Sequence, residues 1–180
     1  MSKLFVISGS SGVGKGTVIK EFLKRNPEFK LSVSCTTRNP RVGEIHGENY
    51  FFLSREEFKT CIEKKEFLEW AEFSGNLYGT KRQYIEEKLA QGKKLSLEID
   101  TQGALNVKKI IPESVLIFIL PPSFEELEAR LRGRHTETEE AIQKRLASTK
   151  LELENSKYFD YEVINDSIEN AVRKLEEIMK

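Results

Sequence analysis

Cysteine is scarce in this sequence, which contains only Cys35 and Cys61 among its 180 residues. Two thiols cannot build a disulfide framework or a four-ligand zinc site, so we expect each to be a small buried apolar residue in a reducing compartment. Long apolar stretches are also missing, because the longest uninterrupted one, Val115–Leu120, is far too short to span a bilayer. These scarcities predict a cytoplasmic protein without a membrane partner.

An excess of charge of either sign is missing as well. The 29 basic and 29 acidic residues give a formal net charge of zero. This balance argues against a general nucleic-acid or membrane-surface binder, although it leaves room for a local basic pocket. The sequence also lacks repeats and low-complexity linkers, and its length suits one α/β domain with a sizeable core.

What the sequence does contain is a glycine-rich segment, Gly9–Thr17, that fits the pattern G-x-x-x-x-G-K. The apolar stretch Leu4–Ser8 precedes it and an amphipathic helical stretch follows, which is the context of a phosphate-binding loop. The loop amides and Lys15 would hold nucleotide phosphates at the helix N-terminus, whereas a plain strand-to-helix turn is the alternative interpretation. Gly16 stands where Ser or Thr usually follows the lysine, and Thr17 comes next.

Strand and helix periodicities alternate along the chain, which predicts an α/β fold with a parallel sheet covered on both faces. The strands expected in this sheet are Leu4–Ser8, Lys94–Ile99, Val115–Leu120 and Tyr161–Ile164. The helices expected around it are Lys15–Arg25, Lys81–Gln91, Gln102–Ile110, Ser123–Leu131, Glu137–Lys157 and Ser167–Met179. A further short strand is expected at Leu31–Cys35. The insert Asn49–Phe73 would project as a small second lobe, with strands at Asn49–Leu53 and Phe67–Phe73. The helix between these strands would begin after a capping box of Ser54 and Glu57.

Two groups of arginines could carry the charge that phosphoryl transfer requires from several directions. One group is Arg38 and Arg41, in a polar loop; the other is Arg130, Arg132, Arg134 and the more distant Arg145. Solvated surface charge is an equally good interpretation of these groups.

Asp100 closes an expected strand beside the phosphate loop, where ligands bind in open α/β sheets. A carboxylate at this place can position Mg²⁺ or a water in its shell. Glu98 faces the same side and could replace Asp100, and a simple turn or capping aspartate is the alternative.

Several further segments resemble the guanylate kinase family. They are Ser34–Glu44, Gly47–Tyr50, Phe67–Ala71, Tyr78–Thr80, Asp100 and Gln102-Gly103, and Arg132–Arg134, Thr136–Thr138 and Lys144–Leu146 resemble the family's lid. The resemblance extends from the phosphate loop to Asn165-Asp166, which is nearly the whole chain. It implies a three-layer P-loop fold in one domain: a core (1–33, 89–122 and 158–180), a small mixed α/β GMP-binding lobe (about 34–88) and a helical lid (about 123–157).

The resemblance also implies roles for individual residues. The residues implied to bind ATP are Gly9, Ser10, Ser11, Gly12, Val13, Gly14, Lys15, Gly16, Thr17 and Asn165. Those implied to bind GMP are Ser34, Arg38, Arg41, Tyr50, Glu69, Tyr78, Thr80 and Asp100. Lys15, Arg38, Arg134 and Arg145 are the implied catalytic residues, and Thr17 and Asp100 would hold Mg²⁺, directly or through water.

The implied reaction is ATP + GMP ⇌ ADP + GDP, with Mg²⁺ as cofactor and dGMP as a further acceptor. Guanine offers N1–H and N2–H₂ as adjacent donors that the carboxylate of Glu69 can accept together, and adenine lacks this pair. Two other functions stay open. One is a non-catalytic guanylate-kinase-like interaction module, which the intact Lys15 disfavours, and the other is a P-loop kinase for another small acceptor.

Overall fold

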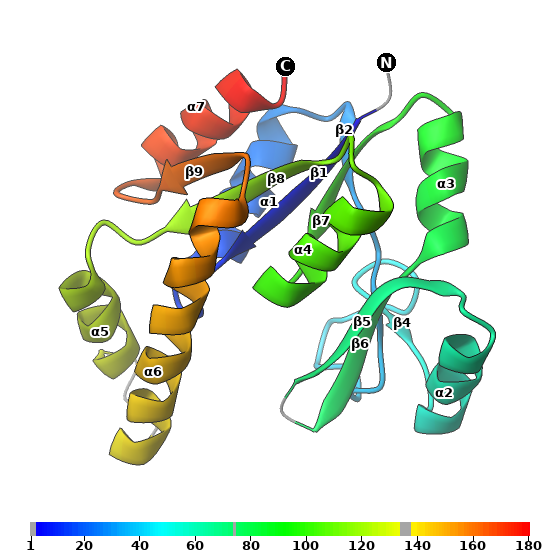
Figure 1. Ribbon diagram of the computed structural model, residues 1–180, viewed down its shortest axis with the longest axis horizontal. Coiled ribbons are helices and arrows are strands. Elements are labelled where there is room, and N and C mark those ends of the chain that lie inside the picture. The colour runs from blue at the N-terminus through cyan, green and yellow to red at the C-terminus, as the bar shows by residue number, and fades with distance from the viewer. Residues whose placement is uncertain (1–2, 74, 134–137) are drawn as a thin grey trace.

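The computed structural model describes residues 3–73, 75–133 and 138–180, so the predicted catalytic residue Arg134 lies outside the described residues. A sheet of five parallel strands forms the centre, in the order β2-β7-β1-β8-β9 (Figure 1). The strands are β1 (Leu4–Gly9), β2 (Phe29–Leu31), β7 (Lys94–Glu98), β8 (Val115–Leu120) and β9 (Tyr161–Ile164). All six residues of β1 are buried, which is typical of a strand covered on both faces.

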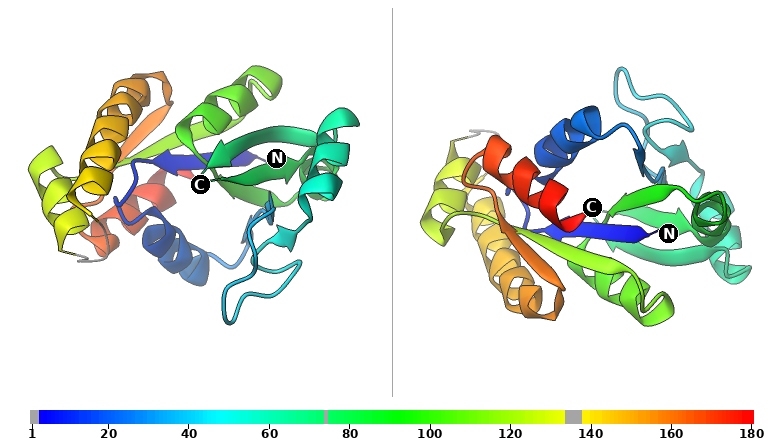
Figure 2. Two further views of the ribbon diagram at one scale, coloured as in Figure 1. Left: turned by 90° about the horizontal axis from the view of Figure 1, so that it is seen from below. Right: turned by 90° about the horizontal axis from the view of Figure 1, so that it is seen from above.

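Helices cover both faces of this sheet (Figure 2). Alternate residues of a strand point to opposite faces. Phe5 and Ile7 therefore pack with α1 (Lys15–Arg25) and α7 (Ile168–Ile178). The other alternate residues of β1 pack with α3 (Arg82–Ala90) and α4 (Thr101–Ile110). The predicted α/β class and parallel sheet are thus confirmed.

A second, mixed sheet forms a lobe with its own small core. Its strand order is β4-β3-β6-β5, with β3 (Cys35–Thr36), β4 (Phe51–Phe52), β5 (Phe67–Phe73) and β6 (Asn76–Lys81). The helix α2 (Arg55–Glu63) begins after a capping box of Ser54 and Glu57, as predicted. Its buried Phe58 stacks on Phe67, with 4.3 Å between ring centroids.

The predicted strand Leu31–Cys35 is wrong, because the structure divides it between the two sheets. β2 ends at Leu31 in the central sheet, and β3 begins at Cys35 in the lobe. Ser32 still donates its amide to the Ser96 carbonyl at 2.8 Å, after which the chain leaves the core. The segment between them is therefore the passage from the core to the lobe.

Two helices, α5 (Phe124–Arg132) and α6 (Glu139–Asn155), form a pair that we call the lid helices. Four buried side chains join them: Leu127, Leu131, Ile142 and Leu146. The helix α6 begins at Glu139 after the N-cap Thr138, two residues later than predicted, and a 3₁₀ turn (Ser156–Tyr158) follows it. Figure 1 shows the lid helices on one side of the molecule and the lobe on the other. No helix in the described ranges is long and apolar enough to cross a membrane.

Candidate nucleotide site

The phosphate loop lies between β1 and α1, as the sequence predicts, and its backbone needs glycine. Gly14 is the N-cap of α1 with a φ of 87°, a left-handed conformation that side chains disfavour. A Cβ on Gly9 would lie 2.7 Å from the carbonyl oxygen of Ile119. No side chain caps α1, so its first amides remain available to a phosphate, beside Lys15.

Asn165 supports this loop from the end of β9. Its side-chain amide donates to the carbonyl of Val13 at 2.7 Å, and its backbone amide donates to Leu120 at 2.8 Å. Asn165 is buried, and its side chain supports the loop from within. Ser10, also in the loop, buries a hydroxyl that bonds to no other described residue.

Glu152 of α6 is a site residue that sequence reasoning missed. Its Oε2 accepts a hydrogen bond of 3.2 Å from the loop amide of Ser11. Burial raises the pKa of Glu152, whereas the Ser11 amide and the charge of Lys15 act to lower it. Arg145 lies seven residues earlier, two turns along the same helix, so α6 presents both groups on one face. That spacing was the only available signal in the sequence.

The residues predicted to bind the phosphate of the acceptor also lie close together. Both terminal nitrogens of Arg38 donate to the Glu44 carboxylate, at 2.9 and 3.0 Å. The Arg38 guanidinium carbon lies 5.5 Å from the centre of the Tyr50 ring, and the rings of Tyr50 and Tyr78 are 6.3 Å apart. The amide of Arg41 donates to the same Glu44 carboxylate at 2.7 Å. Glu44, to which we assigned no role from the sequence, thus holds this loop together.

Glu69 of β5 is buried, with only 7% of its surface exposed. The Thr80 hydroxyl donates to its Oε1 at 2.6 Å. Burial raises the pKa of Glu69 to about 7, and the nearby charge of Asp100 adds to this effect while the Thr80 bond opposes it. A neutral carboxylic acid and a carboxylate are therefore both populated near neutral pH.

The start of α4 shapes the space around this carboxyl group. Asp100 caps the helix, because its Oδ1 accepts from the Gly103 amide at 2.9 Å. A Cβ on Gly103 would lie 2.8 Å from Oε2 of Glu69, so glycine makes room for the carboxyl group. Ser34 immediately precedes β3, where its carbonyl accepts from the Phe51 amide at 2.8 Å. Of these residues, sequence reasoning missed the role of Gly103.

Oxygen donors lie where the phosphate loop meets the end of β7. Oε1 of Glu98 lies 3.8 Å from the place that a Cβ on Gly16 would occupy. Thr17 follows Gly16 in α1, and Asp100, two residues after Glu98, is the N-cap of α4; both residues are exposed. In the described ranges no cluster of three or more His, Cys, Asp or Glu is arranged to hold a metal ion. The donors fit Mg²⁺, which takes one or two protein oxygens and completes its shell with phosphate oxygens and water.

A phosphate loop at the end of a parallel strand, a lobe with a buried carboxyl group and a pair of lid helices define a P-loop phosphotransferase with a second, acceptor site. The chain belongs to the guanylate kinase family, because the sequence model of that family, described as "Guanylate kinase", matches residues 1–180.

Individual proteins agree with this assignment. The guanylate kinase of Prochlorococcus marinus subsp. pastoris is 51% identical over 180 residues, which cover 100% of this chain and 98% of that protein. The guanylate kinase of Synechocystis sp. is 51% identical over 96% of this chain and 91% of its own length. The crystal structure of guanylate kinase from Anaplasma phagocytophilum superimposes with a TM-score of 0.80 at 32% identity, covering 99% of this chain and 84% of that one.

Proposed function

We propose that this protein transfers the γ-phosphate of ATP to GMP, giving ADP and GDP. The observation that carries the proposal is the buried pair of Glu69 and Thr80, in which Glu69 lies against Gly103 at the start of α4. The charge of Asp100 acts on both Glu69 and Glu152, and Glu152 in turn contacts the loop. Glu98 at the end of β7 lies beside Gly16 of the phosphate loop, and Glu69 lies beside Gly103 shortly after that strand, which supports a common site for both groups.

Guanine supplies what the buried carboxyl group of Glu69 requires. Its N1–H and N2–H₂ donate side by side to the two carboxylate oxygens, and the Thr80 hydroxyl already holds one of these oxygens at 2.6 Å. A base without this donor pair would leave a buried carboxylate without partners, which discriminates strongly against it. Ser34 and Asp100 would contact the remaining edge of the base, and dGMP offers the same base.

The phosphate of GMP is already an anionic nucleophile, so the reaction needs alignment and positive charge more than a strong base. Arg38, Arg41, Tyr50 and Tyr78 would hold that phosphate, with Arg38 exchanging its pairing with Glu44 for the new anion.

On the donor side, Lys15 and the loop amides from Gly9 to Thr17 would hold the ATP phosphates. Arg145 would add charge from the lid helices, and we assign the same role to Arg134. The lid helices would also exclude water, which would otherwise turn the kinase into an ATPase.

Mg²⁺ would be held by Thr17 and Asp100, with Glu98 as a further oxygen donor beside Gly16. The ion would neutralise charge on the transferring phosphoryl group. We also propose the division into a core, a GMP-binding lobe and a lid at the boundaries predicted from the sequence. A reducing cytoplasm, where ATP and GMP are available, is the proposed location.

Phosphate transfer from ATP to a panel of nucleoside monophosphates tests the proposal. GMP and dGMP should be used far better than AMP or UMP. Glu69→Gln should lose this preference, whereas the matched variant Glu72→Gln, on an exposed position of the same strand, should keep it. Equal use of AMP by the unaltered protein would favour a kinase for another acceptor. Failure to bind ATP in a calorimeter would favour an interaction module.

A further inference from the structure

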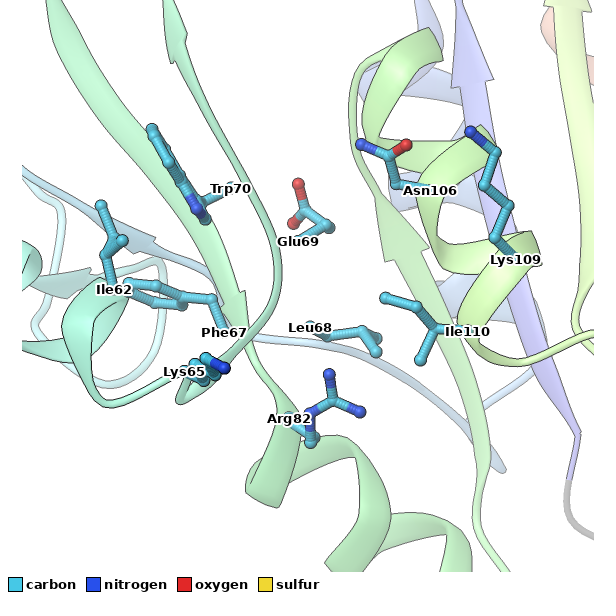
Figure 3. Close-up of a pocket in the computed structure, with 10 residues that line it drawn as sticks. All are labelled: Ile62, Lys65, Phe67, Leu68, Glu69, Trp70, Arg82, Asn106, Lys109 and Ile110. Carbon is cyan, nitrogen blue, oxygen red and sulfur yellow. The ribbon is translucent and has the colours of Figure 1, made fainter.

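A cavity lies between β5 of the lobe and α4 of the core. Its volume is about 440 Å³, which is the scale of a small-molecule site. The end of α2, the strand β5, the start of α3 and the outer face of α4 contribute its walls (Figure 3). The residues that line it are Ile62, Lys65, Phe67, Leu68, Glu69, Trp70, Arg82, Asn106, Lys109 and Ile110.

Three of these residues are cations without partners. Lys65, Arg82 and Lys109 make no side-chain hydrogen bond or ion pair with any other residue that the structure describes. Glu69 is the one acidic residue that lines the cavity beside these three cations, so the lining has an excess of positive charge although the whole chain has a formal net charge of zero. Unpaired positive charge around one concavity attracts anions.

The backbone at Lys65 provides an independent observation. Its φ of 56° is the only positive value at a non-glycine residue in the described ranges. Lys65 terminates α2: its amide donates to Ile62 at 2.9 Å, and the Glu66 amide donates to Cys61 at 2.9 Å. This ending usually carries glycine, since a side chain disfavours the left-handed conformation. A lysine at a strained position on the rim of a cavity is the kind of outlier that points to a ligand.

The other end of the cavity offers an aromatic face. Trp70, the only tryptophan of the chain, is 46% exposed on the wall. Figure 3 shows Trp70 and Asn106 toward one end of the cavity, with Arg82 and Lys65 toward the other. The side-chain amide of Asn106 lies near the aromatic end, and its oxygen can accept from a ring amine.

We propose that this cavity binds a purine nucleoside monophosphate other than the acceptor. The phosphate would contact Arg82 and Lys65, and the base would stack on Trp70. Arginine and lysine hold phosphate by charge and hydrogen bonds, and a flat ring on an indole supplies the rest of the binding. The binding site does not depend on the proposed function. The cavity borders the proposed acceptor site, because Trp70 directly follows Glu69 in β5.

The fluorescence of Trp70 reports on this site directly, since the chain has no other tryptophan. AMP is the test ligand, because its exocyclic amine suits the side-chain oxygen of Asn106 and its base lacks the donor pair of guanine. Titrations are run with the protein alone and with ADP and GMP both saturating. Saturable quenching that persists with ADP and GMP present is expected, and its loss would place AMP in the substrate sites and overturn the proposal.

Variants then assign the binding to the cavity. Arg82→Gln and Lys65→Gly should each weaken AMP binding at least about tenfold, as expected for loss of a charged phosphate contact. Lys65→Gly should at the same time raise the melting temperature, because glycine relieves the strained φ, so a loss of binding could not be attributed to misfolding. The matched control Lys64→Gln changes a neighbouring cation that does not line the cavity and should leave AMP binding unchanged.

Two outcomes would contradict the proposal in different ways. Unchanged AMP affinity in both Arg82→Gln and Lys65→Gly would refute the proposed phosphate contacts. Quenching by inorganic pyrophosphate with the affinity of AMP would refute the stacked base. If the cavity binds AMP while the protein transfers no phosphate to GMP, the proposed function fails and this site stands.

Discussion

Glu69→Gln offers a measurement in which stability and binding should change in opposite directions. Burial raises the pKa of Glu69 to about 7 from an ordinary value of 4.5. The difference corresponds to about 3 kcal/mol, since one pKa unit corresponds to about 1.4 kcal/mol. The side chain is 7% exposed, so solvent screens little of this effect.

The sign follows from which form the folded protein favours. A carboxyl group whose pKa is higher in the folded than in the unfolded protein stabilises folding while it is protonated. This contribution is complete below about pH 4.5 and is lost as the pH rises through about 7. Relative to Glu69→Gln, the free energy of unfolding of the unaltered protein should therefore fall by about 3 kcal/mol between pH 4.5 and about pH 8. Urea unfolding at a series of pH values measures this change in the free energy of unfolding. The same pH dependence in both proteins would refute the argument.

Binding should show the opposite preference, because guanine donates to the ionised form. At pH 6 a group with a pKa of about 7 is about 90% protonated, so GMP binding should release about 0.9 proton from Glu69. Calorimetry in two buffers of different ionisation enthalpy counts these protons. The same measurement on Glu69→Gln counts the protons exchanged by the GMP phosphate itself, and this count is subtracted. Glu69→Gln should bind GMP about 100-fold more weakly at pH 8, while its ATP affinity is unchanged. An equal proton count in both proteins would contradict the assignment of Glu69.

Three further variants test the surrounding groups. Lys15→Ala should lower turnover at least about 100-fold while GMP still binds, and retained turnover would mean that the loop is misassigned. Gly103→Ala should weaken GMP binding at least about tenfold, because its Cβ would lie 2.8 Å from Glu69, whereas alanine favours the helix by about 1 kcal/mol. Unchanged GMP affinity in Gly103→Ala would contradict this explanation. Glu152→Gln should strengthen ADP binding about fivefold to tenfold by removing a negative charge from the phosphate loop, and the exposed Glu154→Gln serves as its control. Weaker ADP binding by Glu152→Gln would refute it.

The parts of the fold that the sequence predicted well are those with a local cause. The helix Lys15–Arg25 and the strands Val115–Leu120 and Phe67–Phe73 have the predicted bounds. Each has a clear apolar period and a glycine, proline or polar boundary in the sequence. The capping box at Ser54 likewise fixes the start of α2 from four neighbouring residues.

The errors in the predicted elements arose where tertiary contacts, rather than the local sequence, determine the structure. Leu31–Cys35 has the composition of one strand, but its first residue pairs in the central sheet and its last residue pairs in the sheet of the lobe. β6 (Asn76–Lys81) was not predicted, because its polar residues and Gly79 resemble a loop until β3 and β5 pair with it on either side. Lys81, expected at the start of a helix, is the last residue of that strand.

The candidate site likewise has parts with a local cause in the sequence and parts that depend on tertiary contacts. The phosphate loop is contiguous, so its spacing alone predicts a nucleotide phosphate. The acceptor residues are scattered, and only the family resemblance connected them. The contact between Ser11 and Glu152 joins residues 141 positions apart, and the space that Gly103 leaves for Glu69 depends on the packing of α4 against β5. No local pattern could have predicted either.

Selectivity and stability of the acceptor site have one physical origin. Glu69 is held where its ionised form is disfavoured, and Gly103 and Thr80 fix the carboxyl group in that place. Two adjacent donors restore to the carboxylate the hydrogen bonds that burial denies it, and guanine supplies both. Adenine supplies neither at that position, so with adenine the disfavoured charge would remain uncompensated. A more exposed carboxylate would make the protein more stable at neutral pH, but water would then satisfy it whichever base was bound. Under the proposed role of Glu69, the acceptor preference depends on keeping this residue in a place that destabilises its charged form.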